Sequence, residues 1–289
     1  MLKVIFIVLL LLLIFFIYNN TERFSTNNKK IALCFLIYDK INHEEIWYKW
    51  LENVDKSKYN IYIHYKEDKK LKYFNDHKLK NCIETCWGCL SVVQAQNLIL
   101  KEALKDEYNH HFIWLSQSCL PFKSFNYIYK NLDTTKSYFN KSPDSQVFPR
   151  ANKALKYLPK DKIKKANMAS IINRKHARIF LEYNDKLKLW FDGINNVDEI
   201  ALISILYYLN LEKELLVTPN IAAGAIIWAQ WADMSNYKIF SDSIKKNDYT
   251  YSYICPEELE YLVKSKSLFG RKFEENCGGL DNLLKMINE

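Results

Sequence analysis

Short apolar runs alternate with segments of helical periodicity over the first half of the chain. Runs rich in β-branched and aromatic residues predict buried strands at 30–39, 59–65 and 110–116. Between them, apolar residues recur at helical spacing in 43–54 and 92–106. The order strand, helix, strand predicts a parallel βαβ unit, and therefore an α/β fold in which helices flank a mixed, mainly parallel sheet.

The pattern is less regular in the second half of the chain. Residues 133–165 are polar and contain three prolines, which predicts an irregular binding loop inside the domain. We expect a strand that runs into a helix at 167–184, and a helix that begins with two acids at 198–211. A short strand at 226–231 and a helix at 256–266 complete the expected elements.

The chain begins with an apolar segment, because residues 4–18 contain no polar side chain except a terminal tyrosine. No small-residue cleavage site follows, so we expect a signal-anchor transmembrane helix at 1–18, with a cleaved signal peptide or a buried helix as alternatives. Lys3 would stay in the cytosol, which predicts a single-pass type II membrane protein with its catalytic domain in the Golgi or ER lumen. A polar stem at 19–29 would lead into one α/β domain at 30–289.

Composition and charge exclude several classes of protein. The chain has 289 residues, of which 49% are hydrophobic and 26% charged, so it is neither disordered nor fibrous. The formal net charge is +8, but the lysines are spread along the whole chain without a basic arm or stripe. We interpret the charge as solvated surface and expect no nucleic-acid partner.

Seven cysteines allow disulfides in a luminal protein, and their odd number leaves at least one thiol unpaired. Cys82, Cys86 and Cys89 form a cluster, but no second pair and no histidine stand at zinc-site spacing, so we expect no metal centre. Asn140 begins a sequon and is a candidate N-glycosylation site, which would make the chain a glycoprotein.

Motifs that identify common nucleotide and hydrolase sites are absent from the sequence. Neither GxGxxG nor GxxxxGK[ST] occurs, which disfavours dinucleotide-binding and P-loop proteins. The GxSxG elbow of α/β-hydrolases and the HExxH zinc motif are also missing. The Asp-x-Asp signature, with which many sugar-nucleotide transferases bind manganese, does not occur either.

Six sequence blocks nevertheless follow one another in a recognisable order. They resemble the core-2/I-branching β-1,6-N-acetylglucosaminyltransferase-like proteins of glycosyltransferase family 14, which also contains peptide O-xylosyltransferases, and are closer to plant and viral members. The blocks together cover almost all of 30–277, and they are IALCFLIYDKINHEEIWYKWLENVDKSKYNIYIHYK (31–66), WGCLSVVQAQNLILKEAL (87–104), NHHFIWLSQSCLPFKSFNYIYKNL (109–132), NRKHARI (173–179), VDEIAL (197–202) and SLFGRKF (267–273).

The resemblance implies a GT-A-like (Rossmann-like) fold, a type II membrane anchor, and inverting transfer of a sugar from a UDP-sugar without a metal ion or other cofactor. Such a transfer is one in-line displacement at the anomeric carbon. It needs a general base for the acceptor hydroxyl and, where no metal is present, a cation for the departing diphosphate. GlcNAc or xylose would be the sugar, and the acceptor a hydroxyl on a glycan or glycoprotein.

The resemblance assigns roles to four residues near the two late blocks. Glu199 in VDEIAL matches the catalytic base, and Asp198 before it is placed on the acceptor side. The alternative for both acids is electrostatic stabilisation of a helix start. Lys272 in FGRKF matches the lysine on the donor diphosphate, with Arg271 beside it. A solvated basic pair at a strand end is the alternative for these two cations.

Further contacts follow from the same resemblance. Leu36 and Ile37 lie where the family binds uracil and ribose of the donor. On the acceptor side the resemblance points to Arg150, Lys165 and Trp231. The alternatives are surface-loop charges for the two cations and core packing for the tryptophan.

One part of the family pattern is missing, because the animal enzymes use a further arginine ahead of the donor lysine. Residues 243–252 contain no arginine, and whether Lys245 or Lys246 replaces it stays open. This departure leaves an alternative function, a catalytically inactive homologue that acts as a glycan-binding or scaffold protein.

Overall fold

The computed structural model describes residues 29–219, 226–229 and 250–288. The anchor expected at 1–18 lies outside the described residues, as does nearly all of the stem. Within the described ranges, no helix has both the length and the apolar character that a membrane crossing needs.

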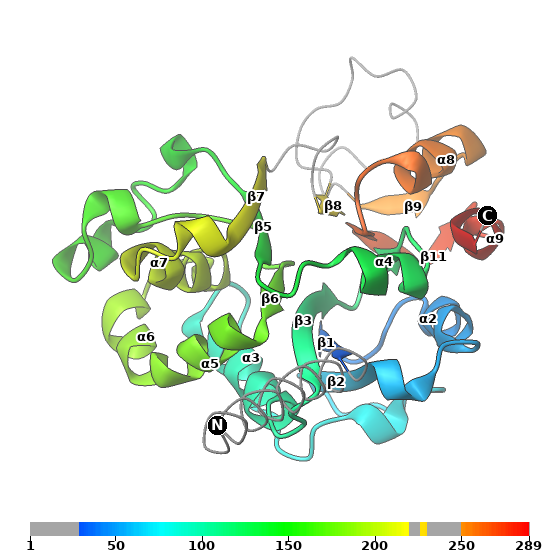
Figure 1. Ribbon diagram of the computed structural model, residues 1–289, viewed down its shortest axis with the longest axis horizontal. Helices are drawn as coiled ribbons and strands as arrows, with labels where there is room; N and C mark the ends of the chain where they lie inside the picture. Colours follow the sequence, from blue (N-terminus) through cyan, green and yellow to red (C-terminus); the bar gives the residue numbers. More distant parts are fainter. Residues whose placement is uncertain (1–28, 220–225, 230–249, 289) are drawn as a thin grey trace, which may run out of the picture.

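The centre of the domain is a mixed sheet of six strands in the order β2-β1-β3-β6-β5-β7 (Figure 1). The pairs β1–β2, β1–β3 and β5–β7 are parallel, whereas β6 runs antiparallel to both of its neighbours. The strands are β1 (Lys30–Ile37), β2 (Tyr59–Tyr65), β3 (Asn109–Ser116), β5 (Ser137–Lys141), β6 (Ile171–Asn173) and β7 (Leu215–Pro219). The expected mixed, mainly parallel sheet is therefore confirmed.

Helices cover both faces of this sheet, as Figure 1 shows. They are α2 (Glu44–Leu51), α3 (Leu90–Ala103), α4 (Phe125–Asn131), α5 (Arg174–Glu182), α6 (Asn184–Phe191), α7 (Ala201–Tyr208), α8 (Pro256–Lys264) and α9 (Leu283–Asn288). Alternate residues of β1 belong to two separate cores, because successive side chains of a strand point to opposite faces. Leu33 and Phe35 pack with α2 and α4, whereas Ala32 and Cys34 pack with α3 and α5–α7.

Two small sheets are built from the last part of the chain and from the short strand that follows β3. They are formed by β4 (Leu120–Pro121), β10 (Phe269–Arg271) and β8 (Ile227–Ala229), and by β11 (Phe273–Gly278) and β9 (Tyr251–Tyr253). The backbone N–H of Phe273 donates to the carbonyl of Ser118, 3.0 Å away. The C-terminal strands are thereby attached to the segment that follows β3.

Asn140 joins the first small sheet to the main sheet. Its side-chain Nδ2 donates to the carbonyl of Ile227 at 2.6 Å, and its Oδ1 accepts from Thr218 Oγ1 and the N–H of Ile226. Asn140 is only 1% exposed. The folded domain therefore leaves this sequon asparagine no room to carry a glycan.

Two parts of the expected element pattern were wrong. The predicted loop at 133–165 contains strand β5, whose polar residues Ser137 and Asn140 are buried and hydrogen-bonded rather than solvated. The acids Asp198 and Glu199 lie in a separate 3-10 turn, η6 (Val197–Glu199), and not in the first turn of an α-helix. Asn196 before this turn has a left-handed backbone, and α7 begins only after Ile200.

Candidate functional site

The carboxyl ends of β1, β2 and β3 meet at one edge of the main sheet, where open α/β sheets bind ligands. The segments that leave the strands are joined there by hydrogen bonds. Lys66 N–H donates to the carbonyl of Tyr38 at 2.9 Å, and Tyr38 N–H donates to Gln117 Oε1 at 2.7 Å. The three strand ends therefore form one continuous rim.

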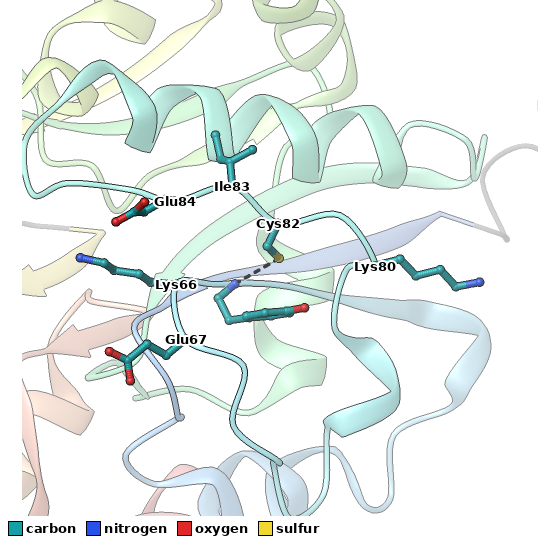
Figure 2. Close-up of a pocket in the computed structure, with 7 residues that line it drawn as sticks. Lys66, Glu67, Lys80, Cys82, Ile83 and Glu84 are labelled. Atoms are coloured by element: carbon teal, nitrogen blue, oxygen red, sulfur yellow. Dashed lines mark hydrogen bonds between the residues drawn. The ribbon is translucent and has the colours of Figure 1, made fainter.

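A cavity of about 420 Å³ opens at the end of β2. It is lined by Tyr65, Lys66, Glu67, Lys80, Cys82, Ile83 and Glu84. In Figure 2 the side chains of Lys66, Glu67 and Glu84 extend to one side of the strand end, whereas Lys80 extends to the other. Leu36 and Ile37, expected at the donor, stand in register with His64 and Tyr65 and so lie beside this cavity.

His64 supports the wall of the cavity. Its ring is buried, and Nε2 accepts the backbone N–H of Ile83 at 3.0 Å. Burial lowers the pKa of His64 to about 4, so the ring stays neutral near pH 7. A neutral ring with one nitrogen committed to a backbone donor has a structural role, and it fixes the loop that contains Ile83.

Lys165 and Glu199 form an ion pair at the other end of this edge. Lys165 Nζ lies 3.0 Å from Glu199 Oε2 and 3.3 Å from Ser142 Oγ. Lys165 is 8% exposed, so the interpretation of this lysine as a surface-loop charge is wrong. The pair is held by the backbone, because Ala166 N–H donates to the carbonyl of Glu199 at 2.8 Å and Ser142 N–H to the carbonyl of Lys165 at 2.9 Å.

Asp198 and Arg271 add a second acid and a second cation to this pair. Burial and the neighbouring Glu199 charge raise the pKa of Asp198 to about 6, against the opposing effects of Arg271 and Lys165. Arg271 reaches the cluster through Asn167, since its Nη1 lies 3.4 Å from Asn167 Oδ1. Asn167 is buried, and its N–H donates to the carbonyl of Asn140. Arg271 and Glu199 therefore both contact the segment 165–167, Arg271 through Asn167 and Glu199 through Lys165 and Ala166.

Arg150 and Lys272, the two other expected site cations in the described residues, are placed differently from each other. Arg150 is exposed on the loop after β5 and, within the described part of the chain, has no hydrogen bond or ion pair with the cluster. Lys272 follows Arg271 directly, and its carbonyl accepts the N–H of Tyr251 at 2.9 Å. Trp231, Lys245 and Lys246 lie outside the described residues.

The described side chains do not gather into a metal-binding group. Over 29–219, 226–229 and 250–288, no three His, Cys, Asp or Glu side chains stand close enough together to hold a metal ion. The Cys82, Cys86 and Cys89 cluster is divided, because Cys86 and Cys89 form a disulfide and Cys82 is a free thiol.

Sequence reasoning missed the polar residues that hold the cluster together. Asn167 and Ser142 support Arg271 and Lys165, but they lie in segments without periodicity. It also missed the cavity side chains Lys66 and Glu84. The position of Lys66 directly after a parallel strand was the only signal in the sequence for such a contact.

Comparison with known proteins identifies the family to which this chain belongs. The family model described as Core-2/I-Branching enzyme matches residues 31–199, more than half of the chain. The match begins in β1 and ends at Glu199, so Arg271 and Lys272 lie beyond it. Glycosyltransferase BC10 of Oryza sativa subsp. japonica is 24% identical over 168 residues, which are 55% of this chain. The match covers 42% of the rice protein, so this chain spans less than half the length of that curated relative.

Solved structures of the galactosyltransferase LgtC are distant neighbours. Its complex with donor and acceptor sugar analogs is 8% identical, covers 84% of this chain and 87% of LgtC, and gives a TM-score of 0.45. An active-site mutant of LgtC is 9% identical with the same coverage and a TM-score of 0.43. At these TM-scores the likeness supports no conclusion about fold or function.

Proposed function

The chain belongs to the Core-2/I-branching enzyme family, and we propose on this basis that it is an inverting, metal-independent glycosyltransferase with a GT-A-like fold. It transfers GlcNAc or xylose from a UDP-sugar to a hydroxyl group of a glycan or glycoprotein. The observation that supports this proposal most is the Lys165–Glu199 ion pair beside Asp198 and Arg271. It places a carboxylate and cations of the required kinds in one cluster.

In this proposal Glu199 is the general base. Its carboxylate takes the proton of the acceptor hydroxyl while that oxygen attacks the anomeric carbon from the face opposite the departing UDP. Lys165 lies 3.0 Å from one carboxylate oxygen and orients the group. The other oxygen, Oε1, is left for the acceptor. The backbone bond from Ala166 to the Glu199 carbonyl keeps this geometry in place before substrate binds.

Arg271 and Lys272 stabilise the diphosphate that leaves. One further negative charge develops on the β-phosphate of UDP as the bond to the sugar breaks. A guanidinium and an ammonium group offset this charge, and the charge that the diphosphate already carries, in the absence of a metal ion. Arg271 already lies close enough to Asp198 to affect its pKa. The leaving group and the base would therefore lie within one electrostatic environment.

The cavity at the end of β2 takes the nucleoside of the donor. It lies at the carboxyl end of the parallel strands and beside Leu36 and Ile37. Its rim continues through Tyr38 and Gln117 to Ser118, which binds the segment after Arg271. A UDP-sugar laid along this rim would place its uridine in the cavity and its diphosphate near Arg271.

We also propose that the domain is luminal and anchored in the membrane by residues 1–18. The Cys86–Cys89 disulfide supports an oxidising compartment such as the ER or Golgi lumen, since such bonds are rare in the cytosol.

The test is turnover and binding by single-site variants of the full chain. Glu199→Gln keeps the shape of the side chain but removes the base, so kcat for UDP release should fall at least about 100-fold. The variant should remain folded by circular dichroism, and its affinity for UDP should not fall. Arg271→Ala and Lys272→Ala should instead weaken UDP binding in calorimetric titration. Glu182→Gln and Lys266→Ala are matched controls, because both side chains are exposed.

The same assay examines metal independence, since an excess of EDTA should leave kcat unchanged. UDP binding without turnover on UDP-GlcNAc or UDP-xylose would identify an inactive homologue. Wild-type kcat in Glu199→Gln would remove this residue from the mechanism.

A further inference from the structure

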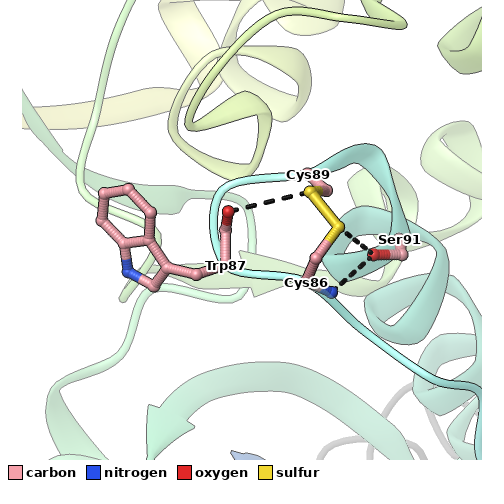
Figure 3. The surroundings of a disulfide bond; sticks show 4 residues. All are labelled: Cys86, Trp87, Cys89 and Ser91. Atoms are coloured by element: carbon pink, nitrogen blue, oxygen red, sulfur yellow. Dashed lines mark hydrogen bonds between the residues drawn. A yellow bond between two sulfur atoms is a disulfide. The ribbon is translucent and has the colours of Figure 1, made fainter.

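A disulfide closes a four-residue loop directly before α3. Cys86 and Cys89 are bonded to each other, and Figure 3 shows the Trp87 side chain pointing away from that bond. Trp87 is 88% exposed and Cys86 is exposed, so solvent reaches this loop. Ser91 Oγ accepts the backbone N–H of Cys86 at 3.1 Å, and Cys89 N–H donates to the carbonyl of Cys86 at 3.2 Å. The loop is therefore rigid although it is exposed.

Gly88, in the middle of this loop, touches the η6 turn that carries Asp198 and Glu199. Its carbonyl accepts the backbone N–H of Val197, the first residue of η6, at 3.2 Å. A Cβ on Gly88 would lie 3.0 Å from the nitrogen and 3.1 Å from Oδ1 of Asn196. Gly88 also has a φ of +70°, which a side chain would strain. The loop thus fits against Asn196–Val197 only because no side chain is present.

The η6 turn is held from two sides. Glu199 N–H donates to the carbonyl of Asn196 at 3.0 Å, and the Glu199 carbonyl accepts from Ala166. The bond from Val197 to Gly88 fixes the start of the turn, and the bond from Ala166 fixes its end. Of these two restraints, the one on the Gly88 side depends on a loop whose shape a covalent bond maintains.

We propose that the Cys86–Cys89 disulfide is a positioning element for Glu199. The closed loop presents the Gly88 carbonyl to Val197 and thereby sets the orientation of the η6 turn. When the disulfide opens, the loop gains conformational freedom, the bond to Val197 weakens, and the turn that carries Glu199 loses one of the two backbone bonds that attach it to neighbouring segments. Cys86 and Cys89 act through Gly88 and Val197 and have no contact with substrate. The predicted effect on turnover rests on the proposed glycosyltransferase function, whereas the effect on the turn does not.

Opening the disulfide with dithiothreitol is a balanced exchange. The two thiols of the reagent supply two electrons and two protons, the bond between the two sulfur atoms breaks, and Cys86 and Cys89 become thiols. The reagent closes to its own cyclic disulfide. The other five cysteines, all in described segments, are free thiols, so no second disulfide is opened.

The first experiment compares the oxidised and the reduced full chain. Hydrogen exchange of the Val197 amide should become about tenfold faster on reduction, as expected when a hydrogen bond of typical strength is lost. Mass spectrometry on peptides that span 194–200 measures this exchange. With UDP-GlcNAc or UDP-xylose, kcat for UDP release should fall about tenfold while KM for the donor stays unchanged. A purely structural role would instead lower the melting temperature and raise KM together.

Variants separate the loop contact from the disulfide itself. Gly88→Ala should lower kcat about as much as reduction does, with the disulfide intact, and dithiothreitol should lower it no further. Gly193→Ala is the matched control, because Gly193 has the same φ of +70° but its added Cβ meets only the end of the Lys153 side chain. It should keep both kcat and the response to reductant. The double variant Cys86→Ser, Cys89→Ser should behave like the reduced chain and ignore dithiothreitol.

Unchanged exchange at Val197 on reduction would overturn the inference. Faster exchange with unchanged kcat would overturn it as well, because Glu199 would then be positioned without the loop. If the oxidised chain turns over neither donor, the proposed function fails, and the exchange measurement alone decides whether the disulfide fixes the turn.

Discussion

Asp198 is the titrating group in the cluster with the clearest consequence for stability. Burial disfavours its charged form, and the negative charge of Glu199 adds to that effect. Arg271 and Lys165 act in the opposite direction but do not cancel it, so the pKa of Asp198 rises from 3.8 to about 6. Replacing this residue by asparagine keeps its size and removes the charge.

The direction of the change in stability follows from the coupling between proton binding at Asp198 and folding. Well below pH 3.8 Asp198 is protonated in both the folded and the unfolded chain, so the substitution should change stability little. Between pH 4 and pH 6 the unfolded chain loses the proton first, and the wild-type protein becomes less stable as the pH rises. Above pH 6 the penalty is complete, and a shift of about two pKa units corresponds to up to about 3 kcal/mol.

We therefore expect Asp198→Asn to raise the free energy of unfolding at pH 8 by up to about 3 kcal/mol, and at pH 4 by less than about 1 kcal/mol. Urea unfolding followed by circular dichroism at the two pH values measures this difference. Asp192→Asn is the control, because Asp192 is exposed and should change stability by no more than about 0.5 kcal/mol. An equal gain at both pH values would show that charge is not the cause. A loss at pH 8 would show that Arg271 and Lys165 outweigh burial.

Two further predictions concern the attachment of the C-terminal strands. Asn140→Ala removes three hydrogen bonds between β5, β7 and the β8 segment and should cost about 3 kcal/mol in urea unfolding, whereas Asn131→Ala, at an exposed asparagine, should cost little. Gly270→Ala would place a Cβ 2.1 Å from the buried ring of Phe122 and should cost about 1–3 kcal/mol with weaker UDP binding, because Arg271 would shift. The control Gly278→Ala meets only the edge of the exposed Tyr253 ring at 3.1 Å, and a loss as large as that of Gly270→Ala would contradict the steric argument.

The first half of the fold could be predicted because its strands are apolar throughout. β2 has the predicted bounds, and β1 and β3 differ from the predicted bounds by one or two residues. Strand β5 could not be predicted in the same way, because its residues Ser137 and Asn140 are polar. They are buried through bonds to partners distant in the chain, as in the bond from Ser137 to His176. Polar residues in a buried strand have no signature that distinguishes them from a loop.

The candidate site, too, could be predicted only in part from the sequence. The resemblance pointed to Glu199, Lys165 and Arg271 individually, but it gave no reason for the first two to form an ion pair. Their pairing accompanies two backbone contacts of Ala166, its antiparallel bridge with Lys141 and its hydrogen bond to the carbonyl of Glu199. Arg271 meets Asn167 across 104 residues of sequence. Such contacts are consequences of tertiary packing, which local pattern does not encode.

The charges of the cluster explain why it can hold a base and a leaving group together. Asp198 and Glu199 offset Lys165 and Arg271, so the four groups are formally neutral before the donor binds. A cluster of cations alone would hold a diphosphate before and after transfer with similar strength, and binding of that kind does not accelerate the chemical step. In the proposed mechanism the two carboxylates oppose the diphosphate in the ground state. Once Glu199, as the proposed base, takes the proton of the acceptor, one of these opposing charges would disappear as negative charge develops on the departing UDP. Under this proposal the cluster would become more positive as negative charge develops on the leaving group, which is the differential stabilisation that catalysis requires.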